Sequence, residues 1–315
     1  SKKVADKLAG MCKTEKEEYE KYWDDISPFI KYGCLKDDKF CEKMTDYILF
    51  KDIDGKYMTL PECLELPDKK ESEEATGEDG EKVEAEVVED EKSSDKDKDK
   101  DKDKDKDKDK VRKIVYYVTD LQQQSQYINM FREQGMNAVV MTHNIDQPFI
   151  NQLESKNEDI KFMRIDADIT DSSKEESTKK EKKQNEKDAK TLTELFHEVA
   201  GNDKLTVKLE VLKNEGISSV LTVSEESRRM QDMMKMYSVG GMDMGMFGSE
   251  GETLVLNSRN ELVKYLINHR DSEDAKLFTA QLYDLAVIAN RPLSADAMTK
   301  FVARSNEIML KLAEK

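Results

Sequence analysis

The fold is decided by the stretch Ile114-Val115-Tyr116-Tyr117-Val118, a short apolar run that predicts a buried β-strand. Residues 138–141 and 162–165 are two further runs of this kind. Helical patterns lie between the runs, and each begins at an aspartate able to cap a helix, Asp120 or Asp146. This β-α-β-α-β order predicts a small parallel sheet with helices packed on it.

The turns of this unit lack the usual phosphate-binding signals. Neither G-x-G-x-x-G nor a Walker A sequence occurs in them. We therefore expect no nucleotide site here, and the sequence offers no candidate catalytic residue.

Residues 1–66 are mostly helical in pattern. Tyr19, Trp23, Ile26 and Ile30 recur every three to four residues, which is the spacing of one helix face. Pro28 lies inside this pattern, so the sequence predicts a kink or a break there. Further helices are expected to begin at Asp37 and at the capping box of residues 59–62.

Residues 68–110 are of low complexity, with 20 acidic and 12 basic residues and a regular Asp-Lys repeat from residue 95 onward. Such a segment has too few apolar side chains to offset the entropy of ordering, so it is expected to be disordered. A calcium site is not expected, because each Asp of the repeat is flanked by Lys.

A second domain is expected after a charged linker at residues 171–190. Leu205, Val207, Leu209 and Val211 alternate with polar residues as in a half-buried strand. Further strands are expected near 220–223 and 254–256, and three helices near 259–268, 273–289 and 294–313.

These patterns together predict a chain of mixed α+β and α/β class. Residues 1–170 are expected to form a helical segment and a small α-β-α layered subdomain that carries the low-complexity insertion. Residues 191–315 are expected to form an α+β domain that ends in a helical dimerisation bundle.

The last two helices have apolar stripes that suit self-association. Two adjacent helices of this kind can pack with a symmetry mate into a four-helix bundle, so we expect a homodimer. The alternative is that both stripes pack on their own domain. The residues expected at the dimer interface are Phe278, Leu282, Leu285, Phe301, Ile308 and Leu312.

A methionine-rich stretch occupies residues 225–247. Methionine is flexible and polarisable, so a cluster of it can adapt to many apolar partners. The plainer reading is an amphipathic helix followed by a loop, because glycines after Val239 disfavour a buried helix. The more specific reading is an adaptable binding surface.

Composition excludes several classes of function. The net charge is −16, which argues against nucleic-acid binding. No run of apolar residues is long enough to span a membrane, and no signal peptide begins the sequence. Four scattered cysteines and three distant histidines form no metal motif and suit a reducing cytoplasm. The chain begins inside a helical pattern, so we expect a fragment of a longer protein.

Several segments resemble the ninety-kilodalton heat-shock chaperones. Residues 1–8, 29–33, 54–60 and 115–119 are similar to that family's middle domain. Residues 280–286 are similar to its dimerisation domain. The Arg228-Arg229-Met230-Gln231-Asp232-Met233 stretch with its Met/Gly tail resembles the bacterial HtpG branch.

The resemblance implies a dimerising, client-binding part of an ATP-dependent chaperone that assists protein folding under stress. ATP and Mg²⁺ would be bound by an N-terminal domain ahead of Ser1, so the fragment itself is expected to hold no cofactor and to be no enzyme. Its partners would be a second copy of itself and non-native client proteins. The residues implied in client binding are Phe149, Ile150, Asn151, Met230, Met233, Met234, Met236, Met242, Met244, Met246 and Phe247.

The sequence departs from the family pattern at one client position. Pro148 stands where some bacterial members have a tryptophan, and the neighbouring Phe149 could replace that anchor. Two alternatives to a client-binding chaperone remain at this point, a purely structural dimerisation module and a small α/β enzyme domain.

Overall fold

The computed structural model describes residues 2–65, 112–169, 173–175, 177–230 and 251–314. The predicted disorder of residues 68–110 lies outside this range, as does most of the methionine-rich stretch. Among the described residues, no helix is long and apolar enough to cross a membrane.

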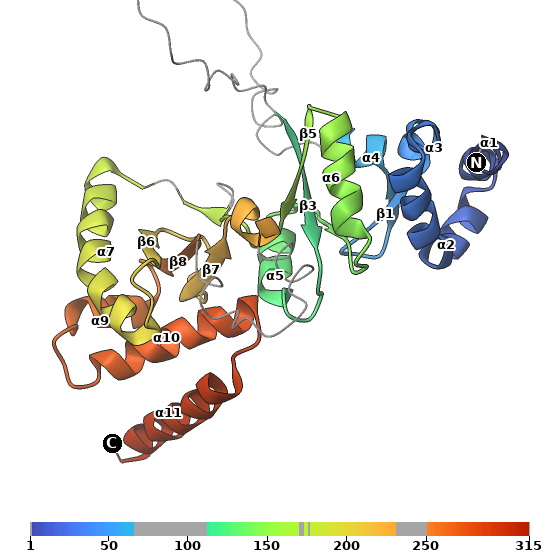
Figure 1. The fold of residues 1–315 in the computed structure, drawn as a ribbon. Helices are drawn as coiled ribbons and strands as arrows, with labels where there is room; N and C mark the ends of the chain where they lie inside the picture. Colours follow the sequence, from blue (N-terminus) through green and yellow to red (C-terminus); the bar gives the residue numbers. More distant parts are fainter. Residues whose placement is uncertain (1, 66–111, 170–172, 176, 231–250, 315) are drawn as a thin grey trace, which may run out of the picture.

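The first part of the chain is a group of helices (Figure 1) beside a sheet that has five strands. The helices are α1 (Lys2–Thr14), α2 (Lys16–Lys36), α3 (Asp38–Met44) and the 3-10 turn η1 (Thr45–Tyr47). α2 does not end at Pro28, so the predicted break is wrong. Trp23 and Ile30 are buried on either side of the proline, and their packing holds the helix together across it.

The sheet has the strand order β2-β1-β4-β3-β5. Its predicted parallel part is confirmed: β3 (Lys113–Val118) runs parallel to β4 (Val139–Val140) and to β5 (Ile160–Arg164). The sequence reading missed the antiparallel hairpin of β1 (Leu49–Asp52) and β2 (Tyr57–Thr59), which extends the sheet past β4. The short helix α4 (Leu60–Glu65) follows this hairpin.

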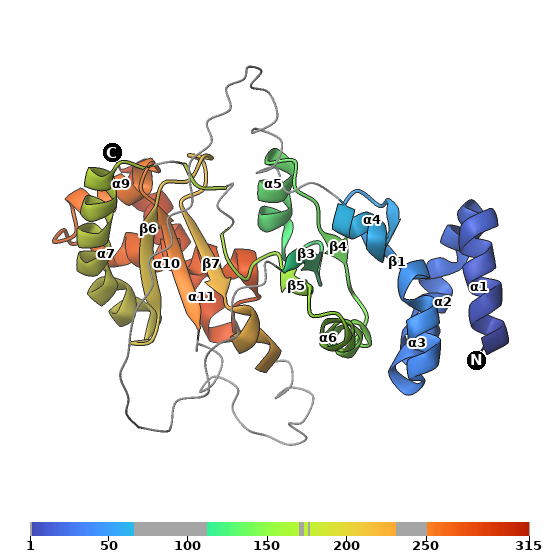
Figure 2. The same ribbon diagram turned by 90° about the horizontal axis from the view of Figure 1, so that it is seen from above.

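Two helices cover opposite faces of this sheet (Figures 1 and 2). α6 (Asp146–Lys156) lies toward α2, and α5 (Ser125–Glu133) lies toward the second part of the chain. A buried ion pair fixes α6, because Lys31 Nζ on α2 lies 2.5 Å from Asp146 Oδ1. The predicted α-β-α layering is therefore present.

The second part of the chain is built on a three-stranded sheet of order β6-β8-β7. β8 (Glu252–Asn257) runs parallel to β6 (Thr206–Glu210) and antiparallel to β7 (Ser219–Val223). One face packs on α7 (Lys179–Ala200), α9 (Glu261–Asn268) and α10 (Ala275–Asn290). Residues 179–190 of the predicted linker are thus the first turns of α7.

The other face of this sheet meets the first part of the chain. Val220 and Val255 point into a core cluster that also contains Val118, Tyr127 and Ile165. Neighbours such as Leu221 and Leu254 point to the opposite face, as the alternation of side chains along a strand requires. The two sheets therefore share one apolar cluster, with α5 between them (Figure 2).

The last helix is α11 (Ala295–Ala313), which packs against α10 (Figure 1). None of its described residues is buried. α11 is therefore the least covered long helix in the described part of the chain.

Candidate functional site

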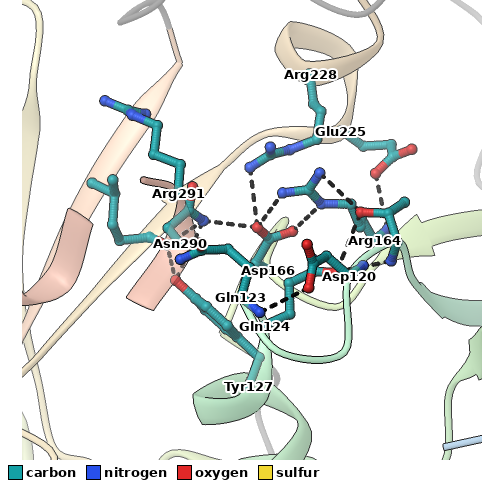
Figure 3. A network of polar contacts seen from close by, with 12 residues as sticks. Asp120, Gln123, Gln124, Tyr127, Arg164, Asp166, Glu225, Arg228, Asn290 and Arg291 are labelled. Atoms are coloured by element: carbon teal, nitrogen blue, oxygen red, sulfur yellow. Dashed lines mark hydrogen bonds and ion pairs between the residues drawn. The ribbon is translucent and has the colours of Figure 1, made fainter. Parts of the chain in front are cut away.

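Asp166 is the centre of a polar network where the two parts of the chain meet (Figure 3). Its carboxylate is fully buried and makes a two-point ion pair with Arg164, with both N–O distances at 2.5 Å. Its Oδ2 also accepts from Arg228 Nη2 at 3.1 Å and from Asn290 Nδ2 at 2.7 Å. One carboxylate thus joins the end of β5, the helical turn at 225–230 and the end of α10.

The surrounding charges decide the protonation state of Asp166. Burial by itself would raise the pKa of the carboxyl group, because it disfavours the charged form. The hydrogen bond from Arg164 and the charges of Arg228 and Arg164 outweigh burial, so the pKa of Asp166 lies below its ordinary value of 3.8. The group is therefore a carboxylate at neutral pH.

The end of α10 has further ties to α5. Tyr127 Oη donates to the carbonyl of Leu221 at 2.5 Å, and Asn290 Nδ2 lies 3.4 Å from the same hydroxyl. Gln123 donates to the carbonyl of Ile288. Asn290 Oδ1 is buried and has no hydrogen-bond partner among the described residues.

Residues 225–230 form a helical turn at the beginning of the methionine-rich stretch. Glu225 holds this turn against the first sheet. Glu225 accepts from Tyr117 Oη at 2.8 Å and from the backbone N–H of Arg164 at 2.9 Å. Burial, followed by the charge of Glu225, raises the pKa of Tyr117, so the phenol keeps its proton as the donor.

Arg229 ties the same turn to α6. It donates to both oxygens of Glu154, at 2.5 and 3.0 Å, and to Asn151 Oδ1 at 2.9 Å. Burial would lower the pKa of Arg229, but the bonds to Glu154 and Glu225 outweigh burial and raise the pKa. The structure therefore brings together two regions that were expected to bind clients, α6 and the start of the methionine-rich stretch.

Two of the expected client-binding residues are not on the surface. Phe149 and Ile150 are fully buried in the core that α6 shares with α2 and β3, so their assignment to an exposed surface is wrong. α6 is covered by α2 on one side and the sheet on the other, which leaves its polar residues outside. Asn151 is exposed there.

Met230 is 55% exposed, as an adaptable contact requires. The remaining expected residues lie outside the described part of the chain: Met233, Met234, Met236, Met242, Met244, Met246 and Phe247. Ser224 and Gly251, on either side of this region, lie close together. The backbone N–H of Ser224 donates to the carbonyl of Gly251 at 3.3 Å.

The expected dimer-interface residues differ in burial and form three groups. Leu282 is buried among α7, α9 and the second sheet, so its assignment to an intermolecular surface is wrong. Phe278 is half-buried against Tyr265, with ring centroids 5.3 Å apart. Leu285 and Leu312 are exposed, whereas Phe301 and Ile308 are half-buried.

A second set of α11 residues forms an exposed apolar stripe that the sequence reading only partly found. Arg304 anchors α11 by bonds to Gln281 and Asp284 of α10. The neighbouring face of α11 is open to solvent. Four exposed apolar residues on it are four, seven and three positions apart, so their side chains lie on one side of the helix. The stripe consists of Met298, Val302, Met309 and Leu312.

The described residues offer little for catalysis or metal binding. No group of three or more metal-ligating side chains occurs among them. Two of the histidines, His197 and His269, contact backbone carbonyls through ring nitrogens. Two shallow hollows lie beside α5, and one of about 400 Å³ is lined by Gln122, Gln126, Leu285 and Ile288.

The sequence reading missed the Asp166 network altogether. One signal could have found its centre, since Asp166 follows the carboxyl end of a parallel strand, where functional side chains often gather. Its partners are Arg164, two residues away, and Arg228 and Asn290, which come from distant segments. No spacing in the sequence predicts that these side chains meet.

Comparison with known proteins gives the class. A family model described as Hsp90 protein matches residues 108–314, well over half of the chain. The chain therefore belongs to the Hsp90 protein family.

The similar individual proteins are bacterial and carry the name chaperone protein HtpG. The one from Porphyromonas gingivalis is 26% identical over 284 residues, covering 88% of this chain and 36% of that protein. The one from Bacteroides thetaiotaomicron is 26% identical over 277 residues, covering 86% and 35%. The one from Treponema denticola is 24% identical over 319 residues, covering 99% and 43%. The chain spans little more than a third of the length of the first two relatives.

Proposed function

We propose that this chain is the dimerising, client-binding part of an ATP-dependent molecular chaperone that works in the cytoplasm. Membership of the Hsp90 family and similarity to proteins named chaperone HtpG support the general role. The observation that carries the more specific proposal is the exposed apolar stripe on α11. Binding of ATP and Mg²⁺ is proposed for the longer protein and not for these residues.

The stripe favours a second copy as its partner. Val302, Met309 and Leu312 are 50, 58 and 66% exposed, although each is a large apolar side chain. Contiguous exposed apolar surface marks interaction sites in soluble proteins. The helices α10 and α11 pack antiparallel, and a two-fold axis would place them against a second pair in a four-helix bundle.

The client contact is proposed at the beginning of the methionine-rich stretch. Met230 is exposed there, and the adjacent Arg229 bonds to Asn151 on α6. A flexible thioether beside exposed amides suits non-native chains, which present both apolar side chains and unpaired backbone groups.

A structural module without client contact is the second candidate. The burial of Phe149 and Ile150 favours it, because it removes two apolar side chains from the expected client surface. An enzyme function has no comparable observation in its favour.

Two measurements test the proposal. Light scattering of the chain at about 10 μM should give the mass of a dimer. Titration with fluorescent, reduced and carboxymethylated α-lactalbumin, which cannot refold, should show saturable binding. A dimer that does not bind this probe would favour the structural module, and a monomer would contradict the dimerisation proposal.

A further inference from the structure

Arg229 uses all three of its side-chain nitrogens, and two of them join the helical turn 225–230 to the first part of the chain. Nε donates to Glu225 within the turn at 2.8 Å. Nη1 donates to Asn151 and Glu154 on α6, and Nη2 donates to Glu154 and, at 2.9 Å, to the carbonyl of Phe162 on β5. The planar, five-donor guanidinium is the side chain that can make such a set.

We propose that Arg229 is the positioning residue of the client site: it holds Met230 and Asn151 in a fixed arrangement so that they act as one contact surface. The inference rests on the proposed client-binding function. It concerns a residue that would act through its neighbours, without requiring that Arg229 touch the client.

The charges around Arg229 explain why the arrangement depends on it. Glu154 and Glu225 both lie against the one guanidinium, and Glu225 is buried. Without the arginine, two carboxylates would face each other with little water to screen them, and like charges at this distance repel. The turn that carries Met230 would then move away from α6.

The neighbouring arginine has a different task. Arg228 is buried and bonds to Asp166, inside the network that joins the two parts of the chain. Arg229 lies at the rim, with its side chain 24% exposed. A change at Arg229 should therefore disturb the surface arrangement while the junction stays intact.

The test is a titration of the full chain with the fluorescent, reduced and carboxymethylated α-lactalbumin. Arg229→Ala should raise Kd about tenfold, as expected for loss of a few charge-assisted hydrogen bonds that hold the site in place. Arg229→Lys should give an intermediate Kd, because lysine restores the charge without the planar fork. Arg132→Ala is the matched control: Arg132 also pairs with a surface carboxylate, Asp54, at 3.0 Å, and this variant should bind as the unchanged chain does.

Two readouts separate positioning from general damage. In Arg229→Ala, hydrogen exchange should become faster in residues 225–230 and stay unchanged in α10. In a double-mutant cycle with Glu154→Ala, the double variant should bind no worse than Arg229→Ala alone, because both changes remove the same ion pair between Arg229 and Glu154.

Three results would overturn the inference. They are unchanged binding in Arg229→Ala, strictly additive losses in the cycle, and a loss in Arg229→Lys as large as that in Arg229→Ala without faster exchange in the turn. If the unchanged chain does not bind the probe, the proposed client function itself fails, and the inference fails with it.

Discussion

Asn290, the last residue of α10, donates a 2.7 Å hydrogen bond to Asp166, which follows β5 by two residues. The two residues are 124 positions apart in the sequence. Asp166 belongs to the part of the chain that carries α6, and Asn290 precedes the turn into α11. The contact therefore fixes the direction in which the proposed dimer helices leave the rest of the molecule.

Neutralising Asp166 should destabilise the fold strongly. Asp166→Asn leaves Arg164 and Arg228 without their shared carboxylate in a buried site, and removal of one partner from a buried pair costs about 3–5 kcal/mol. Urea unfolding measures the loss. The control is Asp168→Asn, at an exposed position two residues away, which should change the free energy of unfolding by less than about 0.5 kcal/mol. Equal effects of the two changes would contradict the importance of the network.

The same network predicts a specific acid sensitivity. Because the pKa of Asp166 is lowered in the folded state, its contribution to stability is complete above the ordinary value of 3.8 and is lost as the pH falls through the lower folded pKa. The stability difference between the unchanged chain and Asp166→Asn should stay constant from about pH 7 to 5 and shrink below about pH 3.8. Urea unfolding at several pH values tests this. A difference that already shrinks between pH 7 and 5 would show that another group controls the network.

Charges on the α11 stripe should separate the proposed dimer without unfolding the protomer. Val302→Asp and Met309→Asp place carboxylates on side chains that are exposed within one chain but would be buried between two. Sedimentation velocity at about 10 μM should show monomers, and circular dichroism should show an unchanged fold.

Leu282→Asp is the contrasting variant for that experiment. Leu282 is 3% exposed inside its own domain, so the same charge should unfold the second part of the chain. A folded monomeric Leu282→Asp, or a Val302→Asp variant that still dimerises, would place the interface elsewhere.

Gly251 should tolerate no side chain. Its φ is +79°, and a Cβ built on it would lie 2.1 Å from Ser227 Oγ, within the turn that carries Met230. Gly251→Ala should therefore cost about 1–3 kcal/mol in thermal or urea unfolding. Gly10→Ala in α1 is the matched control, since no described atom lies within 4 Å of its built Cβ. That change should be neutral or stabilise the helix by up to about 1 kcal/mol. A neutral Gly251→Ala would show that the contact with Ser227 is loose.

The sequence predicted the parts of the fold that depend on local pattern. The three parallel strands and the helices between them follow from apolar runs and helical spacing, and all are present. The predicted capping by Asp120 and Asp146 is wrong, because α5 begins after Gln124 and α6 begins after Ile145, and neither cap has a side-chain hydrogen bond. The β1–β2 hairpin was missed although Asp54-Gly55 is a local turn signal, because its strands are too short to show a clear alternation. Its pairing with β4 is a long-range contact that no local pattern shows.

Burial within a helix was harder to predict than the helix itself. Leu282 and Leu285 belong to the same apolar stripe of α10, yet one is buried and the other exposed. Spacing shows that two residues share a face, but only the positions of the sheet, α7 and α11 determine which part of the face is covered. Phe149 and Ile150 were misplaced for the same reason, since α6 lies between α2 and a sheet.

The most direct test of client binding is the suppression of aggregation of heat-unfolded citrate synthase by this chain, with and without four methionines of the methionine-rich stretch. The variant changes Met230, Met233, Met234 and Met236 to Ser; the last three lie outside the described residues. We expect the unchanged chain to suppress aggregation, and we expect the variant to lose most of this effect while keeping its melting temperature and its dimer. Equal suppression by both chains, or no suppression by either, would contradict the proposed client-binding function.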